Sequence, residues 1–128
     1  MLLANAHSGR PLDSQPVNLS ELCEAITAER GVPAEITAGI TVDGDPELLR
    51  QAVDNLVRNA VTHGAADTAT LALTTPATVT VTNADGDARS TTGHGLGLTL
   101  VQAIADAHRA TFTITQHDDG SVVATLRF

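Results

Sequence analysis

The stretch DPELLRQAVDNLVRNA, residues 45–60, decides the fold, because one short segment combines a helix start, an amphipathic period and a pair of amides. Asp45 followed by Pro46 predicts a helix N-terminus, since aspartate caps free N–H groups and proline suits the first helical position. The apolar residues recur at three- and four-residue spacing and form one broad stripe. Asn55 and Asn59 stand one turn apart at its margin, where they project to the same side.

The segments before this helix predict one further helix and one strand. Asn18 followed by Glu21 resembles a capping box, and apolar residues at helical spacing then continue to a stop at Gly31. Residues 35–42 alternate in polarity and are interpreted as one strand that runs into a turn at Asp43-Gly44.

The segments after the helix, which we expect to end at Gly64, predict strands, a loop and another helix. Residues 67–75 and 77–83 alternate apolar and threonine side chains around Pro76, as two connected strands would. Residues 84–97 are a predicted loop, and a helix begins directly from its glycines. Residues 111–117 and 121–128 predict a terminal hairpin.

Size and charge limit the classes of function. A chain of 128 residues fits one domain, which we place at residues 17–128 after a lead-in at residues 1–16. The formal net charge of −8 opposes binding to nucleic acid or to an anionic membrane, and two aromatic residues offer little surface for base stacking. The single cysteine, Cys23, excludes an internal disulfide, so we expect it to pack as a small apolar residue. An anionic ligand therefore needs a local binding device.

Gly93-His94-Gly95-Leu96-Gly97-Leu98 is a candidate for that device. Alternating glycines let backbone N–H groups approach phosphate oxygens, and a following helix adds partial positive charge. The same pattern also suits a flexible turn with close helix packing. No Gly-Lys-Ser/Thr element is present, which excludes a P-loop, and the spacing differs from a dinucleotide-binding fingerprint.

The pair Asn55 and Asn59 is the second candidate. Amide oxygens are neutral, hard ligands that can complete the coordination of Mg²⁺ when phosphates and water supply the rest. Solvated or capping asparagines are the alternative interpretation. Arg58 is a candidate to screen phosphate charge, but it lies four residues after Asp54, so we expect these two to form a surface ion pair.

Together, residues 45–60 and 93–98 resemble the N box and the G2 box of bacterial sensor histidine kinases. The resemblance runs from about Pro16 to the C-terminus, because the same order of helix, strand and hairpin surrounds the two boxes. It implies an α/β (α+β) two-layer sandwich, a mixed β-sheet with about three helices on one face, which is the Bergerat-type fold that histidine kinases share with gyrase-type topoisomerases, mismatch-repair ATPases and a heat-shock chaperone.

The resemblance also implies a site for ATP and Mg²⁺. Asn59 would bind the Mg²⁺ that bridges the triphosphate, and Asn55 would act as the catalytic residue beside the phosphates. Thr62 and His63 fall where the family often contacts phosphate or adenosine, although His63 also fits a simple helix-end histidine. The implied ATP-binding residues are Asn55, Asn59, Thr62, His63, Asn83, Asp85, Gly86, Gly93, His94, Gly95, Leu96, Gly97 and Leu98.

The chain departs from the family at the G1 box, which normally supplies an aspartate that accepts a hydrogen bond from the adenine amino group. The expected position holds Asn83, and Asp85 follows two residues later. The amide oxygen of Asn83 can still accept that bond, so two readings stay open: Asn83 by alignment and Asp85 by chemistry.

A second departure is the short connection between the boxes. Only residues 87–92 separate Gly86 from Gly93, where relatives carry a long ATP lid and a phenylalanine-containing F box. This predicts an open lid and weaker retention of nucleotide. A natural truncation and an engineered deletion would look alike.

These observations lead to one expected function with two alternatives. The favoured function is a histidine kinase catalytic domain that acts on a histidine of a separate dimerisation domain, with a response regulator as the indirect partner. We expect the fragment to be monomeric, not to phosphorylate itself, to bind no nucleic acid, and to come from the cytoplasmic portion of a membrane-anchored kinase. The alternatives are a degenerate interaction module with little nucleotide binding and an anti-sigma-type serine kinase.

Overall fold

The structure is a computed structural model, and it describes residues 14–63, 69–83, 95–117 and 121–128. Within them a mixed sheet of five strands has the order β2-β4-β5-β7-β6. Its members are β2 (Ala34–Ile36), β4 (Thr70–Thr74), β5 (Thr78–Asn83), β6 (Thr111–Gln116) and β7 (Val122–Arg127). Strand β2 is parallel to β4, and the other neighbours are antiparallel, which confirms the two predicted hairpins.

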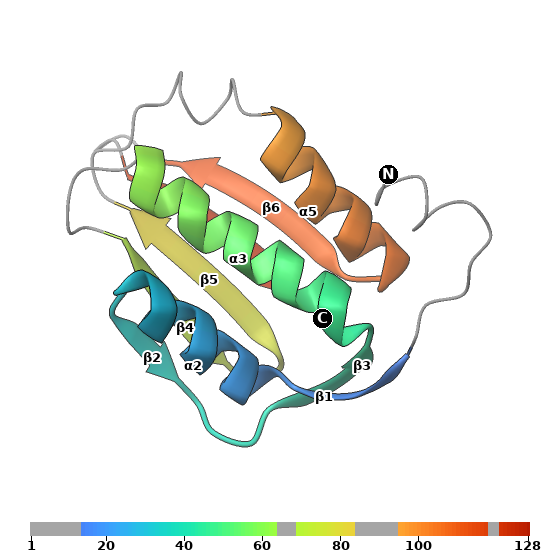
Figure 1. Ribbon diagram of the computed structural model, residues 1–128. Helices are drawn as coiled ribbons and strands as arrows, with labels where there is room; N and C mark the ends of the chain where they lie inside the picture. The colour runs from blue at the N-terminus through green and yellow to red at the C-terminus, as the bar shows by residue number, and fades with distance from the viewer. Residues whose placement is uncertain (1–13, 64–68, 84–94, 118–120) are drawn as a thin grey trace.

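Three helices of the described segments cover one face of this sheet (Figure 1). They are α2 (Leu19–Arg30), α3 (Pro46–His63) and α5 (Gly95–Ala107). This two-layer arrangement confirms the expected fold class. None of the described helices is long and apolar enough to cross a membrane.

The core lies between the two layers. Alternate strand residues, among them Leu73, Val79 and Leu126, face the helices and are buried, and the stripe of α3 packs onto them through Val53 and Val57. Each such fully buried side chain contributes about 1.5–3 kcal/mol. The opposite face of the sheet carries mainly threonines, as the alternating pattern predicted.

Cys23 belongs to this core. It is fully buried in α2, and burial raises the pKa of its thiol to about 12. The thiol is therefore protonated at neutral pH and packs as a small apolar group, as expected.

The ends of the helices follow the capping signals in the sequence. The Asn18 side chain accepts a hydrogen bond from the Glu21 N–H at 3.0 Å, and α2 ends at Gly31, whose φ of 69° suits glycine. The Asp45 carboxylate accepts from the N–H groups of Glu47 and Leu48 at the start of α3. These contacts satisfy N–H groups that would otherwise lack partners.

The first strands differ from the prediction. Residues 35–42 do not form one strand, because the chain turns after β2 and begins a separate strand, β3 (Thr41–Gly44). Strand β3 pairs with β1 (Gln15–Asn18), which starts inside the stretch that the sequence assigned to an irregular lead-in. The alternation of polarity continues through the turn at Gly39, whose φ is 78°, and so conceals the break.

Helices α3 and α5 pack side by side in opposite directions (Figure 1). Just after α5, the His108 Nε2 accepts a hydrogen bond from the Asp45 N–H at 3.0 Å, which joins the C-terminal end of α5 to the N-terminal end of α3. The first turn of α5 therefore lies along the C-terminal half of α3, where Asn55 and Asn59 are. His108 is therefore a structural residue that links the two helices.

Candidate functional site

Two side-chain amides at the margin of α3, those of Asn55 and Asn59, differ in how deeply they are buried. Asn55 is buried, with 7% of its surface exposed, and Asn59 is half-buried. The Nδ2 of Asn59 is buried and has no hydrogen-bond partner among the described residues. A buried amide N–H without a partner costs free energy, so it marks a position where an external acceptor would be stabilising.

Asn83, the last residue of β5, brings a third amide to the same end of the sheet. It is 5% exposed, and its Nδ2 donates a hydrogen bond to the Ala60 carbonyl of α3 at 3.3 Å. Since a carbonyl can only accept, this contact fixes the orientation of the carboxamide. The Oδ1 of Asn83 is left buried without a partner in the described structure, as an acceptor for a donor from outside.

The beginning of α5 completes the arrangement. This helix starts at Gly95 and packs against α3 in the opposite direction, so its N-terminal end lies toward the C-terminal half of α3, which carries Asn55 and Asn59. Free N–H groups at a helix N-terminus favour an anion. The geometry brings together neutral amides and a helix terminus, a combination suited to a phosphate-bearing ligand in an acidic protein.

The described side chains contain no cluster of three or more His, Cys, Asp or Glu that could hold a metal ion. A divalent cation at this site would need phosphate oxygens and water for most of its coordination.

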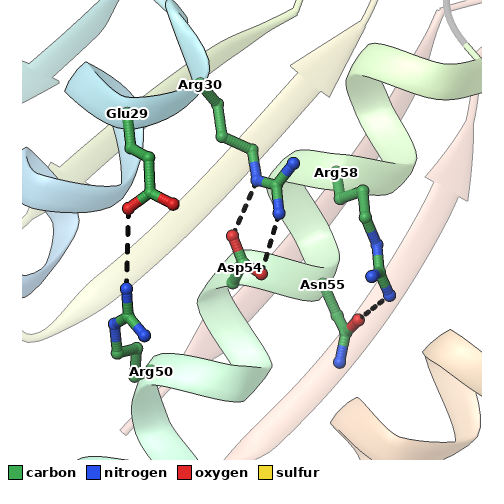
Figure 2. A network of polar contacts seen from close by, with 6 residues as sticks. All are labelled: Glu29, Arg30, Arg50, Asp54, Asn55 and Arg58. Atoms are coloured by element: carbon green, nitrogen blue, oxygen red, sulfur yellow. Dashed lines mark hydrogen bonds and ion pairs between the residues drawn. The ribbon is translucent and has the colours of Figure 1, made fainter.

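The ion pairs beside the site differ from the prediction (Figure 2). Asp54 does not pair with Arg58. Its carboxylate binds the Arg30 guanidinium of α2 in a bidentate manner, at 2.7 and 3.0 Å, which holds the pKa of the Asp54 carboxyl below its ordinary value. Arg58 instead donates from Nη2 to the Asn55 Oδ1. Spacing along one helix could not reveal that a residue of another helix competes for Asp54.

The predicted site residues are thus only partly placed. Asn55 and Asn59 lie one turn apart on α3, and Asn83 is hydrogen-bonded to the Ala60 carbonyl of the same helix. Thr62 and His63 belong to the last turn of α3. Leu98 is half-buried in α5, and Gly95, Leu96 and Gly97 belong to the first turn of this helix. Asp85, Gly86, Gly93 and His94 lie outside the described residues. The sequence did not indicate the Ala60 carbonyl, because a backbone acceptor leaves no residue-type signal.

The fold defines a class of protein, in which helices cover one face of a mixed sheet and buried amides lie at the margin of the central helix. A sequence model of the family described as "Histidine kinase-, DNA gyrase B-, and HSP90-like ATPase" matches residues 44–128. The chain belongs to this family.

Individual relatives agree with that membership. "Probable sensor histidine kinase TcrY" of Mycobacterium tuberculosis is 30% identical in a match that covers 90% of this chain and 31% of the relative. The cytoplasmic segment of histidine kinase QseC is similar with a TM-score of 0.78 at 20% identity, over 99% of this chain and 87% of that chain. The ATP binding domain of PrrB from Mycobacterium tuberculosis is similar with a TM-score of 0.74 at 23% identity, over 91% and 96% of the two chains. The two structures show the shared fold.

The alignment with the kinase TcrY also shows a difference in length between the two chains. It extends over 150 residues, more than the 128 residues of this chain, so the relative carries residues that this chain lacks. The chain corresponds to less than a third of the relative, whose other segments have no counterpart here.

Proposed function

We propose that this chain is the ATP-binding catalytic domain of a sensor histidine kinase, which binds ATP with Mg²⁺ for phosphoryl transfer to a histidine of a separate dimerisation domain. The observation that carries the proposal is a pair of buried amide atoms that have no partner among the described residues. They are Asn59 Nδ2 on α3 and Asn83 Oδ1 at the end of β5, which contacts α3 at the Ala60 carbonyl. This hydrogen-bond donor and this acceptor would both be satisfied by a ligand that carries an acceptor and a donor of its own.

Asn83 is proposed to bind the adenine. Its Nδ2 is held by the Ala60 carbonyl, so its Oδ1 can accept a hydrogen bond from the adenine amino group. This favours Asn83 over Asp85. Gly86 is among the ATP-binding residues that the resemblance to the family implies.

Asn59, Asn55 and α5 are proposed to bind the triphosphate. Asn59 would use its Oδ1 as a Mg²⁺ ligand, and Asn55 would lie against the phosphates. The N–H groups that open α5, with Gly93 and His94 before it, would neutralise phosphate charge. Thr62 and His63, one turn beyond Asn59, are proposed to contact phosphate or adenosine.

ATP supplies the phosphoryl group, and the residues of this chain bind and orient it. Phosphoryl transfer depends mainly on positioning and charge stabilisation, so neutral amides and backbone N–H groups suffice on this side of the reaction. The acceptor is proposed to lie on another domain. His108, one of the described histidines, is committed to Asp45 and to the Ile104 carbonyl.

The remaining assignments follow from this role. Residues 1–16 are proposed as a lead-in from the dimerisation helices, and residues 17–128 as the catalytic domain. The partners would be the dimerisation domain and, indirectly, a response regulator, with the domain on the cytoplasmic side of a membrane-anchored kinase.

Calorimetric titration with a non-hydrolysable ATP analogue tests the proposal. We expect binding that strengthens with Mg²⁺ and an Asn59→Ala variant that loses most of the Mg²⁺-dependent gain while keeping its stability. The short lid makes a degenerate interaction module the competing function. A folded wild-type domain that shows no binding at millimolar nucleotide would favour that module.

A further inference from the structure

We infer that Arg58 is a positioning residue for the nucleotide phosphates: it turns the Asn55 carboxamide so that the amide N–H₂, and not the oxygen, is presented to them. We infer further that Arg30 keeps Arg58 available for this task by occupying Asp54. The inference rests on the proposed function, because it concerns how the same site meets its phosphates.

The contact between Arg58 and Asn55 fixes the orientation of the amide. The guanidinium has only donors, so the carboxamide atom that meets Arg58 must be the oxygen. Figure 2 shows the Asn55 nitrogen turned away from Arg58. Both residues belong to α3. Asn55 is buried and Arg58 is exposed, so the arginine side chain extends from the surface to the buried amide.

This orientation decides what a phosphate would meet. Phosphate oxygens are acceptors and carry negative charge, so an amide N–H₂ attracts them and an amide oxygen repels them. The Arg58 guanidinium binds the Asn55 Oδ1, the atom that would repel a phosphate, and adds a positive charge close to it. A freely rotating Asn55 carboxamide would present either its oxygen or its N–H₂ group to the phosphates, and ordering it would reduce the free energy of binding.

The ion pair between α2 and α3 explains why Arg58 is free to do this. Asp54 stands four residues before Arg58, a spacing at which aspartate and arginine attract each other on a helix surface. Arg30 instead engages both oxygens of Asp54. A second link from α2, between Glu29 and Arg50 at 3.5 Å, runs alongside in the same network (Figure 2). The last turn of α2 thereby directs Arg58 toward Asn55.

Five variants test this relay, which runs from Arg30 through Asp54 and Arg58 to Asn55, by calorimetry with the ATP analogue and Mg²⁺. Arg58→Ala should weaken binding roughly threefold to tenfold, the range for one lost hydrogen bond. Combined with Asn55→Ala, it should weaken binding no further than Asn55→Ala alone. Arg30→Ala should also weaken binding, because Asp54 then draws Arg58 away. Arg30→Ala combined with Asp54→Ala should recover affinity close to that of the wild type.

The Arg30→Ala and Asp54→Ala combination tests the part played by Arg30, because truncating Asp54 removes the carboxylate that would draw Arg58 away from Asn55. Urea unfolding of each variant shows whether it is folded. An undiminished effect of Arg58→Ala in the Asn55→Ala background would mean that Arg58 contacts phosphate directly, and it would overturn the inference. A failure of the rescue would overturn the part played by Arg30.

An NMR measurement without nucleotide separates this inference from the proposed function. The Asn55 side-chain N–H₂ signals, identified by their loss in Asn55→Ala, should shift in Arg58→Ala and in Arg30→Ala but return in the Arg30→Ala and Asp54→Ala combination. Unchanged signals would overturn the positioning role even if nucleotide binds well. Shifted signals in a domain that binds no nucleotide would support the relay and reject the proposed function.

Discussion

The sequence left two candidates for the adenine contact, Asn83 and Asp85. A substitution at Asn83 distinguishes between them. Asn83→Leu keeps the approximate size of the side chain and removes its acceptor. If Asn83 Oδ1 meets the adenine amino group, affinity for ADP should fall about tenfold or more, as for the loss of a buried hydrogen bond of about 1.4 kcal/mol. Calorimetry measures the change.

Asn83→Asp is the matched control. It keeps an acceptor for adenine but replaces the donor that meets the Ala60 carbonyl by an oxygen, so it should cost about 1–3 kcal/mol of unfolding free energy and retain nucleotide binding. Unchanged affinity in Asn83→Leu would assign the adenine contact to Asp85 instead.

Asp54 gives the second residue-scale prediction, a dependence of stability on pH. Hydrogen bonding to Arg30, followed by its charge, lowers the pKa of the Asp54 carboxyl in the folded state. Such a group stabilises the fold above its unfolded pKa of about 3.9 and loses that contribution as the pH falls through the lower folded value. Asp54→Asn should therefore cost about 0.5–1 kcal/mol at pH 7, a figure reduced for partial exposure.

Urea unfolding of the wild type and Asp54→Asn over a series of pH values checks this. The gap between the two curves should begin to shrink near the unfolded pKa of about 3.9 and should close as the pH falls through the lower folded value, where the wild-type carboxyl becomes protonated. A gap that stays constant down to pH 2 would show that packing, and not charge, accounts for the loss.

At the scale of elements, His108 and Gly44 link three segments. A Cβ at Gly44 would lie 2.6 Å from the His108 Cδ2 and 3.0 Å from the Leu49 Cδ1, so only glycine fits at the end of β3. Gly44→Ala should destabilise the domain by about 1–3 kcal/mol through overpacking. His108→Ala should cost a similar amount, because it removes the bond to the Asp45 N–H and the edge-to-face contact with Phe128.

The two changes should not add. Because His108 is the nearest neighbour that the new Cβ meets, Gly44→Ala should cost less in the His108→Ala background than in the wild type. Thermal or urea unfolding of the four proteins gives the coupling. Strict additivity would mean that Leu49, and not His108, sets the limit at Gly44.

The elements also show what the sequence could predict and why the rest was missed. Helix ends were predicted well because their signals are local: Asn18, Gly31 and Asp45 act on backbone groups only a few residues away. The break between β2 and β3 and the pairing of β1 with β3 were missed, because they depend on partners distant in the sequence.

The candidate site divides in the same way. The two asparagines of α3 follow from helical spacing, whereas the tether of Asn83 to Ala60 and the choice of Arg30 by Asp54 arise only when separate elements pack together. The residue types predicted which chemical groups the candidate site contains. Tertiary contacts then decided which amide atom remains available to a ligand.

At the scale of the whole molecule, nucleotide binding should appear as stability. A ligand that binds only the folded state stabilises it by about 2.7 kcal/mol at a hundred times its dissociation constant, which raises the melting temperature of a domain of this size by several degrees. ATP with Mg²⁺ should therefore raise the melting temperature in a concentration-dependent way. The short lid should make millimolar nucleotide necessary.

The identity of the base sharpens this prediction. Guanine carries a carbonyl oxygen where adenine carries its amino group, so it would face the Asn83 Oδ1 with a second acceptor. Turning the amide around would instead set its oxygen against the Ala60 carbonyl. GTP with Mg²⁺ should thus raise the melting temperature far less than ATP does at equal concentration, as measured by calorimetric scanning. Equal shifts would mean that the site recognises the triphosphate alone, and the role of Asn83 as the base contact would be lost.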